Sequence, residues 1–227
     1  MKVRIKFSKE GPVKFIGHLD VMRYFQKAIR RADIDIAYSA GFSPHQIMSF
    51  AAPLSVGHTS SGEYFDIELN SLDSIENLIK RLNGVMVEGI CILDAKVLDE
   101  KEKNAMASVA AADYLVTFSD HMCLPDDWKD KLDAFYQQDQ ITVIKKTKKG
   151  EKELDLKAGI YQLAIRDNIV YMLLDAGSGS NLKPGFVLET FFETTKTVLP
   201  AFPFRVHRLE TYKREEDGSL MPLITNG

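Results

Sequence analysis

The sequence has little cysteine, no long apolar run and no excess of positive charge. Its 227 residues include 2 cysteines, and the formal net charge is −3. The overall charge argues neither for nor against nucleic acid, so any cationic surface must be local. No apolar stretch approaches the roughly 20 residues that cross a bilayer. We therefore expect a protein that makes no use of a membrane.

The few cysteines also bear on the cellular compartment. Cys91 and Cys123 are far apart, and the opening MKVRIKFSKEG is charged rather than apolar. This favours a reduced, cytoplasmic protein whose thiols are buried or inert. A content of 45% hydrophobic residues is enough to build packed cores. The length suits two domains of about 100 residues each.

The first half of the chain alternates between strand and helix periods. Val3, Ile5 and Phe7 alternate with charged residues, as in a half-buried strand, and residues 18–32 carry apolar side chains at helical spacing. An extended segment at about 34–38, a strand at 64–69, a helix after Asn70 and a final strand at 85–98 follow. The order is that of the ferredoxin-like βαββαβ unit.

The same order of elements recurs in the second half, without residue-level similarity between the halves. The sequence therefore predicts an α+β fold of two tandem ferredoxin-like domains with antiparallel sheets. The predicted boundaries are residues 1–100 for the first domain, 101–110 for a linker, 111–214 for the second domain and 215–227 for a frayed tail.

Cationic side chains gather at two places. Arg23, Lys27, Arg30 and Arg31 fall on the outer arc of the first helix, and the guanidinium fork of arginine matches phosphate. Lysines also gather on a hairpin of the second half, where they are typical of a solvated tip: Lys145, Lys146, Lys148, Lys149 and Lys152. Together with open-faced antiparallel sheets, the arginine arc favours RNA over DNA.

The segment between the first helix and the strand at 64–69 is long and punctuated by glycine and proline. Such a connection is more often functional than idle. We interpret it as a long β2–β3 recognition loop whose candidate contact residues are Tyr38, Ser39, Phe42, His45, Ser49, His58, Ser60 and Glu63.

Catalytic and metal-binding signals are weak. His18, His45 and His58 lack the paired spacing of a zinc site, and the sequence has no nucleophile elbow. We predict no metal and no cofactor. One of these histidines could still act as acid-base catalyst in a metal-independent RNA cleavage. The loop Gly177–Ser180 ahead of a helix is more typical of a connector than of a phosphate site, and its role stays open.

One stretch carries a family resemblance. GHLD with a following R, then RR, YS-x-GF-x-PH, SF, PL-x-VG and S-x-GEY occur within Lys2–Leu69, and LDLK and NLKPGFVLE occur later. These motifs resemble the radical-SAM-associated (radical-SAM-linked) protein family, a bacterial domain of unknown function. The resemblance implies a radical-SAM protein as partner and an RNA- or ribosome-related substrate. Two distant cysteines cannot supply the closely spaced cysteines of the radical-SAM cluster, so this chain is not itself the radical enzyme.

Three hypotheses follow. The leading one is a non-catalytic accessory of a radical-SAM enzyme that recognises substrate, with tRNA, rRNA or another ribosome-related RNA as the ligand. The second is an RNA-processing or RNA-modifying enzyme with a histidine catalyst. The third is a protein-interaction module that docks to the radical-SAM partner without touching nucleic acid. The sequence leaves the oligomeric state open.

Overall fold

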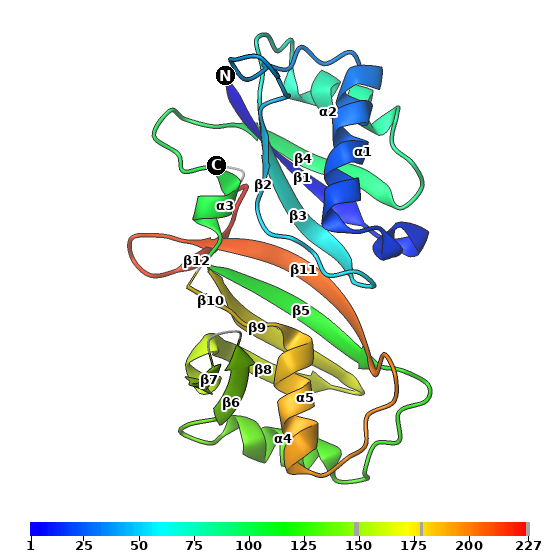
Figure 1. The fold of residues 1–227 in the computed structure, drawn as a ribbon, viewed down its shortest axis with the longest axis vertical. Helices are drawn as coiled ribbons and strands as arrows, with labels where there is room; N and C mark the ends of the chain where they lie inside the picture. The colour runs from blue at the N-terminus through cyan, green and yellow to red at the C-terminus, as the bar shows by residue number, and fades with distance from the viewer. Residues whose placement is uncertain (148–149, 178, 226–227) are drawn as a thin grey trace. The chain divides into compact units, whose positions relative to one another are not determined.

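In a computed structural model, which describes residues 1–147, 150–177 and 179–225, the chain forms two compact units (Figure 1). The first unit contains Met1–Ala110 together with the residues from Arg208 onward, and the second is Ala111–His207. Both combine helices with mostly antiparallel strands. The predicted α+β class is confirmed.

The first unit follows the element order strand, helix, strand, strand, helix, strand. β1 lies between β3 and β4, with antiparallel pairing on both sides, and β2 pairs with β3. The elements of this unit are β1 (Lys2–Lys9), η1 (Gly11–Phe15), α1 (His18–Arg31), β2 (Met48–Phe50), β3 (Thr59–Glu68), α2 (Ile75–Asn83), β4 (Ile90–Val97), α3 (Ala105–Ser108), the end of β11 (Phe204–Arg214) and β12 (Leu220–Pro222).

The core of this unit lies between the sheet and the helices α1 and α2. The alternating residues of β1 are buried as predicted, and Phe7 meets Phe25 of α1 with 4.8 Å between ring centroids. Phe50 of β2 stacks on Phe65 of β3 at 5.1 Å. Aromatic pairs of this kind contribute about 0.5–1.5 kcal/mol beyond the area that they bury. This cluster fixes how α1 lies on the sheet.

The second unit is built around β9, which pairs antiparallel with β5, β8 and β10. β6 and β7 form a separate two-stranded sheet, and Phe191 and Phe192 of α5 are buried in the core. The elements of this unit are β5 (Ala111–Phe118), α4 (Trp128–Tyr136), β6 (Thr142–Thr147), β7 (Gly150–Asp155), η2 (Lys157–Gly159), β8 (Ile160–Arg166), β9 (Ile169–Gly177), β10 (Ser180–Asn181), α5 (Pro184–Thr194) and the beginning of β11.

Three segments differ from the sequence-based predictions. β2 lies at Met48–Phe50, inside the predicted loop, because these residues pair with Phe65–Ile67 of β3. The predicted linker contains α3, whose Ala105 is fully buried. The predicted tail contains β12, which pairs with β11, and the buried residues Leu223 and Ile224.

Cys91 and Cys123 are both exposed, so the expectation of buried thiols is wrong, while that of inert thiols stays a prediction. Among the described helices, none is long and apolar enough to cross a bilayer.

Candidate nucleic-acid interface

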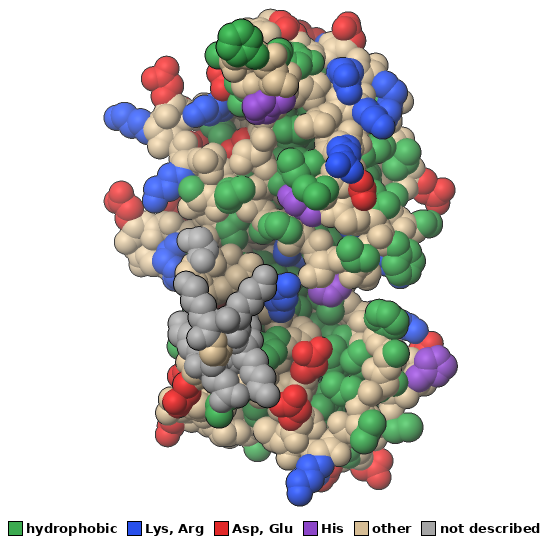
Figure 2. Space-filling view, viewed as in Figure 1, with side chains coloured by type: hydrophobic (Ala, Val, Ile, Leu, Met, Phe, Trp, Pro, Cys, Tyr) green, Lys and Arg blue, Asp and Glu red, His purple; other side chains and the backbone are tan. Residues whose placement is uncertain are grey.

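The outer face of α1 carries a cationic stripe formed by Arg23, Lys27 and Arg30. At 100° per residue these three side chains fall within an arc of about 60°. All three are exposed, while the opposite face of the helix buries Val21, Phe25, Ala28 and Ile29 in the core. Figure 2 shows Lys and Arg side chains gathered over the region that α1 occupies in Figure 1. Burial of the apolar face thus holds the stripe toward solvent.

The cations of the stripe have few internal partners. The Arg23 guanidinium lies 3.2 Å from the Asp20 carboxylate, and both side chains are more than half exposed. The Arg30 Nε donates to the backbone oxygen of Gln26 at 3.3 Å. Lys27 has no ion pair within the described part of the chain. An exposed pair like that of Arg23 contributes only about 0–1 kcal/mol, so these charges remain available to a ligand.

Arg31, the fourth predicted contact residue, lies at the edge of the stripe and is partly used within the fold. Its guanidinium donates to the Val85 oxygen at 3.3 Å and lies 5.7 Å from the centre of the Tyr24 ring. Arg81 of α2 similarly donates its Nε to the Ala32 oxygen at 3.0 Å. These cations interact favourably with helix C-termini, which carry partial negative charge.

On the other side of the stripe lies a short closed loop, residues 39–45, which we call the clasped loop. The Ser39 N–H donates to the His45 oxygen at 2.8 Å, and the Ser39 Oγ is 2.8 Å from the His45 Nδ1. Next to the loop, the Gln46 Nε2 donates to the Gln26 oxygen of α1 at 3.2 Å. Two predicted contact residues are open to solvent, Tyr38 at 51% exposure and Phe42 at 111%.

The other predicted loop residues do not share this surface. Ser49 lies in β2, and Ser60 is fully buried, with its Oγ accepting from the Gly62 N–H at 3.1 Å. Glu63 is buried as well and pairs with Arg208 at 2.8 Å. The interpretation of residues 38–63 as one recognition loop is therefore wrong, because the second part of the segment is strand β3.

The three histidines occupy separate environments. His45 belongs to the clasped loop, and the His58 N–H donates to Ser55 in a turn before β3. His18, at the start of α1, is half-buried with its ring edge-on to Phe50 at 5.5 Å. Burial lowers the pKa of His18; the Glu63 carboxylate opposes this change and the Lys9 ammonium adds to it. Among the described residues, these histidines belong to no group of three or more His, Cys, Asp or Glu side chains that could hold a metal ion.

A small cavity next to His18 is lined by Lys9, Glu63 and apolar side chains. Lys9 is almost fully buried, and its ammonium donates to the backbone oxygens of Lys14 at 3.3 Å and Ile16 at 3.0 Å. Burial lowers the pKa of Lys9. The cavity measures about 10 Å³, which is the room of one water molecule. The geometry therefore fits a lysine that supports the η1 turn better than it fits a substrate pocket.

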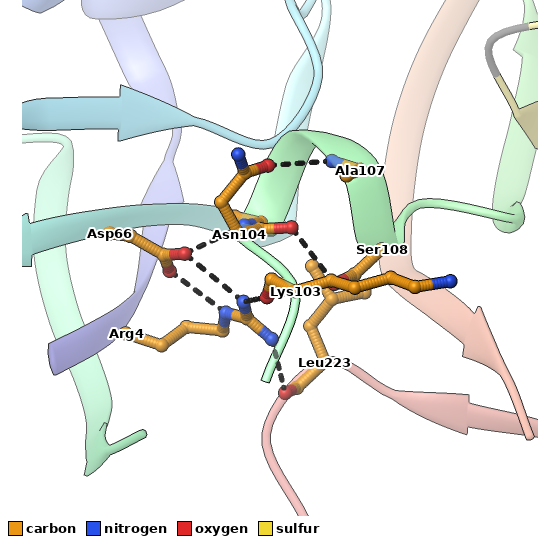
Figure 3. Close-up of polar contacts among 8 residues, drawn as sticks. Arg4, Asp66, Lys103, Asn104, Ala107, Ser108 and Leu223 are labelled. Atoms are coloured by element: carbon orange, nitrogen blue, oxygen red, sulfur yellow. Dashed lines mark hydrogen bonds and ion pairs between the residues drawn. The ribbon is translucent and has the colours of Figure 1, made fainter. Parts of the chain in front are cut away.

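A buried polar centre on the sheet of the first unit was not predicted from the sequence. Arg4 is fully buried and forms a two-point pair with Asp66, at 2.8 Å from Nε to Oδ1 and 3.1 Å from Nη2 to Oδ2. The guanidinium also donates to the backbone oxygens of Lys103 and Leu223 (Figure 3). Asp66 accepts in addition from the Ala105 N–H at 2.6 Å. This pair ties α3 and the C-terminal segment to the first sheet.

Glu210 forms a related centre at the end of β11. Lys6 and the Tyr64 hydroxyl both donate to its carboxylate, at 2.5 and 2.7 Å. Burial and the neighbouring Glu210 charge raise the pKa of Tyr64 well above its ordinary value. β3 approaches β11 so closely that a Cβ on Gly62 would lie 2.5 Å from the Glu210 Cα. Glycine is therefore required at this point of the GEY motif.

The remaining candidate sites give no support to a metal or phosphate centre. In the part of the chain that the structure describes, no three His, Cys, Asp or Glu side chains are placed to hold a metal ion. In the Gly177–Ser180 loop, Ser178 lies outside the described residues, and the Gly177 N–H donates to the Asp175 carboxylate at 2.9 Å. A carboxylate at this position repels an anion.

The lysine hairpin of the second half cannot be described in the same way. Lys148 and Lys149 lie outside the described residues, as do the side chains of Lys145, Lys146 and Lys152.

Comparison with known protein families identifies the family to which the chain belongs. The profile of a family described as "Uncharacterized protein conserved in bacteria (DUF2344)" matches residues 2–184. The chain belongs to this family. The DUF2344 description names no activity and no partner, so the association with a radical-SAM protein stays a prediction.

Other comparisons add little to the DUF2344 assignment. No curated protein matches the chain. Among solved structures, a chain of the "Crystal Structure of a Cbf5-Nop10-Gar1 Complex" superposes with a TM-score of 0.48 and 10% sequence identity, over 94% of this chain and 50% of that chain. The protein thus spans half the length of the matched chain, and a likeness at this level carries no argument about function.

Proposed function

We propose that this DUF2344 protein is a non-catalytic recognition protein that binds RNA through the cationic stripe of α1 and acts with a radical-SAM enzyme. The observation that carries the RNA part is the exposed row of Arg23, Lys27 and Arg30 on one face of the helix. The overall formal charge of the protein is −3, so the positive potential of this row is confined to one part of the surface.

Internal helix stabilisation accounts for only part of this stripe. Cations in the last turn of a helix are favourable because of the macrodipole, which applies to Arg30 and Arg31. Arg23 lies in the first half of α1, where a cation gains nothing from that dipole. Lys27 lies between the two ends and completes the i, i+4, i+7 spacing. A polyanionic ligand gives all three charges a common role.

The contacts of His45 and His18 support a role in recognition rather than in catalysis. His45 closes a loop with Ser39, and His18 packs on Phe50 next to a cavity of water size. The radical-SAM partner rests on the sequence resemblance of Lys2–Leu69. The alternatives, an RNA-cleaving enzyme with a histidine catalyst and a protein-docking module, give different outcomes in the experiment below.

We also infer that each unit is a variant of the ferredoxin-like fold. In the first unit the strand order β2-β3-β1-β4, with helices in the two crossovers, is the order expected of that fold. In the second unit β8, β9, β5 and the beginning of β11 correspond, and the β6–β7 hairpin is an insertion.

The proposal is tested by the salt dependence of RNA binding. In the triple variant Arg23→Gln, Lys27→Gln, Arg30→Gln, helix propensity is preserved while three charges are removed. Fluorescence anisotropy with a labelled RNA, a hairpin with single-stranded tails, is measured from 50 to 300 mM salt. The slope of log K against log salt is expected to become shallower by about 2, because each single-strand phosphate contact contributes roughly 0.7.

A charge-matched control is available in the second unit. Lys129→Gln, Lys131→Gln, Lys196→Gln changes the net charge equally at exposed positions, and its salt slope is expected to match the wild type. An equal loss in the control, or a wild type without salt-sensitive binding, would contradict the proposal. The RNA is also run on a denaturing gel after incubation. Cleavage that disappears in His18→Gln would favour the enzymatic alternative.

A further inference from the structure

The clasped loop, which precedes the Gln46 contact with α1, holds an aromatic ring in water. Phe42, near its centre, is 111% exposed, and the preceding Gly41 has a φ of +107° that permits the sharp turn. The backbone and side-chain bonds between Ser39 and His45 close the base of the loop. Exposing a whole phenylalanine ring forgoes about 1.5–3 kcal/mol of burial free energy. Because exposure of the ring costs free energy, a ring that a closed loop keeps exposed is suited to bind a ligand.

The loop is attached to α1 at the stripe itself. The backbone oxygen of Gln26 accepts both from Gln46, which follows the loop, and from Arg30 of the stripe. Gln46 is buried at 5% exposure, so this attachment is held within the fold. Gln26 lies about 60° around the helix from Arg23, on the side opposite to Arg31. Gln46 therefore attaches the end of the aromatic loop to the side of α1 that is next to the row of cations. Arg23 and Arg30 are about 10 Å apart along the helix axis.

The geometry points to single-stranded RNA as the ligand, with unpaired bases stacked on Phe42 and Tyr38 and the adjoining phosphates bound by Arg23, Lys27 and Arg30. This inference rests on the proposed function and specifies its substrate class. Base stacking on aromatic rings combined with a cationic track is the general means by which single strands are bound. In a duplex the base faces are stacked on one another and cannot reach the ring.

The surface favours RNA over a protein partner because of its composition. In protein-docking surfaces lysine and acidic residues are depleted, whereas arginine and aromatic residues are enriched. Here the loop that carries the exposed ring is attached to the helix that carries the row of like charges, which suits a polyanion. Asp20 pairs with Arg23 of this row. A protein ligand is therefore treated as one outcome of the test.

The test replaces the ring while keeping an apolar side chain. Phe42→Leu removes the aromatic face, and Phe202→Leu is the matched control, because Phe202 is 90% exposed in the second unit. Binding of a 12-nucleotide single strand carrying 2-aminopurine is compared with binding of a blunt RNA duplex. For Phe42→Leu we expect single-strand affinity to fall about 5- to 150-fold, with the salt slope unchanged. Quenching of 2-aminopurine should be lost, and duplex binding should stay as in the wild type. Tyr38→Leu should give a smaller loss in the same direction.

The failure of this inference is distinguishable from failure of the proposed function. A wild type that binds RNA with a salt slope but prefers duplex, or a Phe42→Leu variant equal to Phe202→Leu, overturns the stacking site and leaves the cationic site intact. Absence of any salt-sensitive binding overturns both. If Phe42→Leu leaves RNA affinity unchanged but abolishes co-purification with a radical-SAM protein after nuclease treatment, the loop is a protein-docking element and the inference is wrong. Circular dichroism confirms that each variant is folded.

Discussion

Two groups of arginines in the first unit have the same chemistry and opposite environments. Arg4 and Arg208 are buried at 0% and 6% exposure, and each is paired with a carboxylate at 2.8 Å. Arg23 and Arg30 project from α1 into solvent. Desolvation makes the difference, because a buried charge must be matched inside the fold, whereas an exposed charge keeps its hydration and can exchange it for a ligand. Removal of a buried arginine should therefore reduce stability, whereas the exposed ones are available for function.

Removing Arg4 should have the largest effect. Arg4→Ala leaves the Asp66 carboxylate buried without its cation and removes the donors to Lys103 and Leu223. We expect a loss of about 3–5 kcal/mol in the free energy of unfolding, measured by urea denaturation. The control is Arg23→Ala, which should change stability by less than about 0.5 kcal/mol. Equal effects of the two substitutions would remove the distinction between the buried and exposed groups.

The second buried pair should be more tolerant of an isosteric change. Glu63→Gln keeps the shape of the side chain and its ability to accept from Arg208, but it removes the negative charge that faces that guanidinium. A destabilisation of about 1–3 kcal/mol is expected from the same urea titration. RNA affinity should not change, since Glu63 is buried and lies outside the stripe. A reduction in affinity without loss of stability would place Glu63 in the binding surface.

The smallest expected effect concerns His18, at the boundary between core and surface. Its lowered pKa means that the folded protein binds this proton less readily than the unfolded chain does. The stability that depends on the neutral ring is therefore fully present above pH 6.5, the unfolded value, and decreases as the pH falls below it.

Urea midpoints from pH 7.5 to 5 should consequently fall more steeply in the wild type than in His18→Gln. The groups that face the ring, Lys9 and Glu63, are common to both proteins and cancel in the difference. A parallel decline in the two proteins would indicate that burial of the ring is too slight to matter.

Much of the fold was predictable because the spacing of apolar residues in the sequence matches the positions that are buried in the structure. The apolar positions of β1 and α1 repeat at the spacing of their elements. Val3, Ile5 and Phe7 of β1 are buried, as are Val21, Phe25, Ala28 and Ile29 of α1. The polar positions of β1 were misleading, since alternation separates two faces of a strand but does not tell which face is covered by further chain. Arg4 is covered by the segment around Lys103 and by Leu223, which is 219 residues away in sequence.

The candidate site was predictable in part for the same reason. Helical spacing places Arg23, Lys27 and Arg30 on one face without any tertiary information. β2 was missed because three residues are too few to establish a period, and its pairing with β3 depends on long-range contact. The available signal for the clasped loop was the pair of turn residues Gly41 and Pro44 between Ser39 and His45. Which of the flanking side chains are exposed followed only from the structure.

The composition of the first unit has a consequence for synthesis on the ribosome. Residues 1–110 are made first, but Arg208, β12 and Leu223 follow only after the 97 residues of 111–207. At roughly 5–20 residues per second, this interval lasts about 5–20 s. Throughout it, Glu63 lacks its guanidinium partner and Arg4 lacks one of its backbone acceptors. The first unit is thus completed only after the second unit has been made.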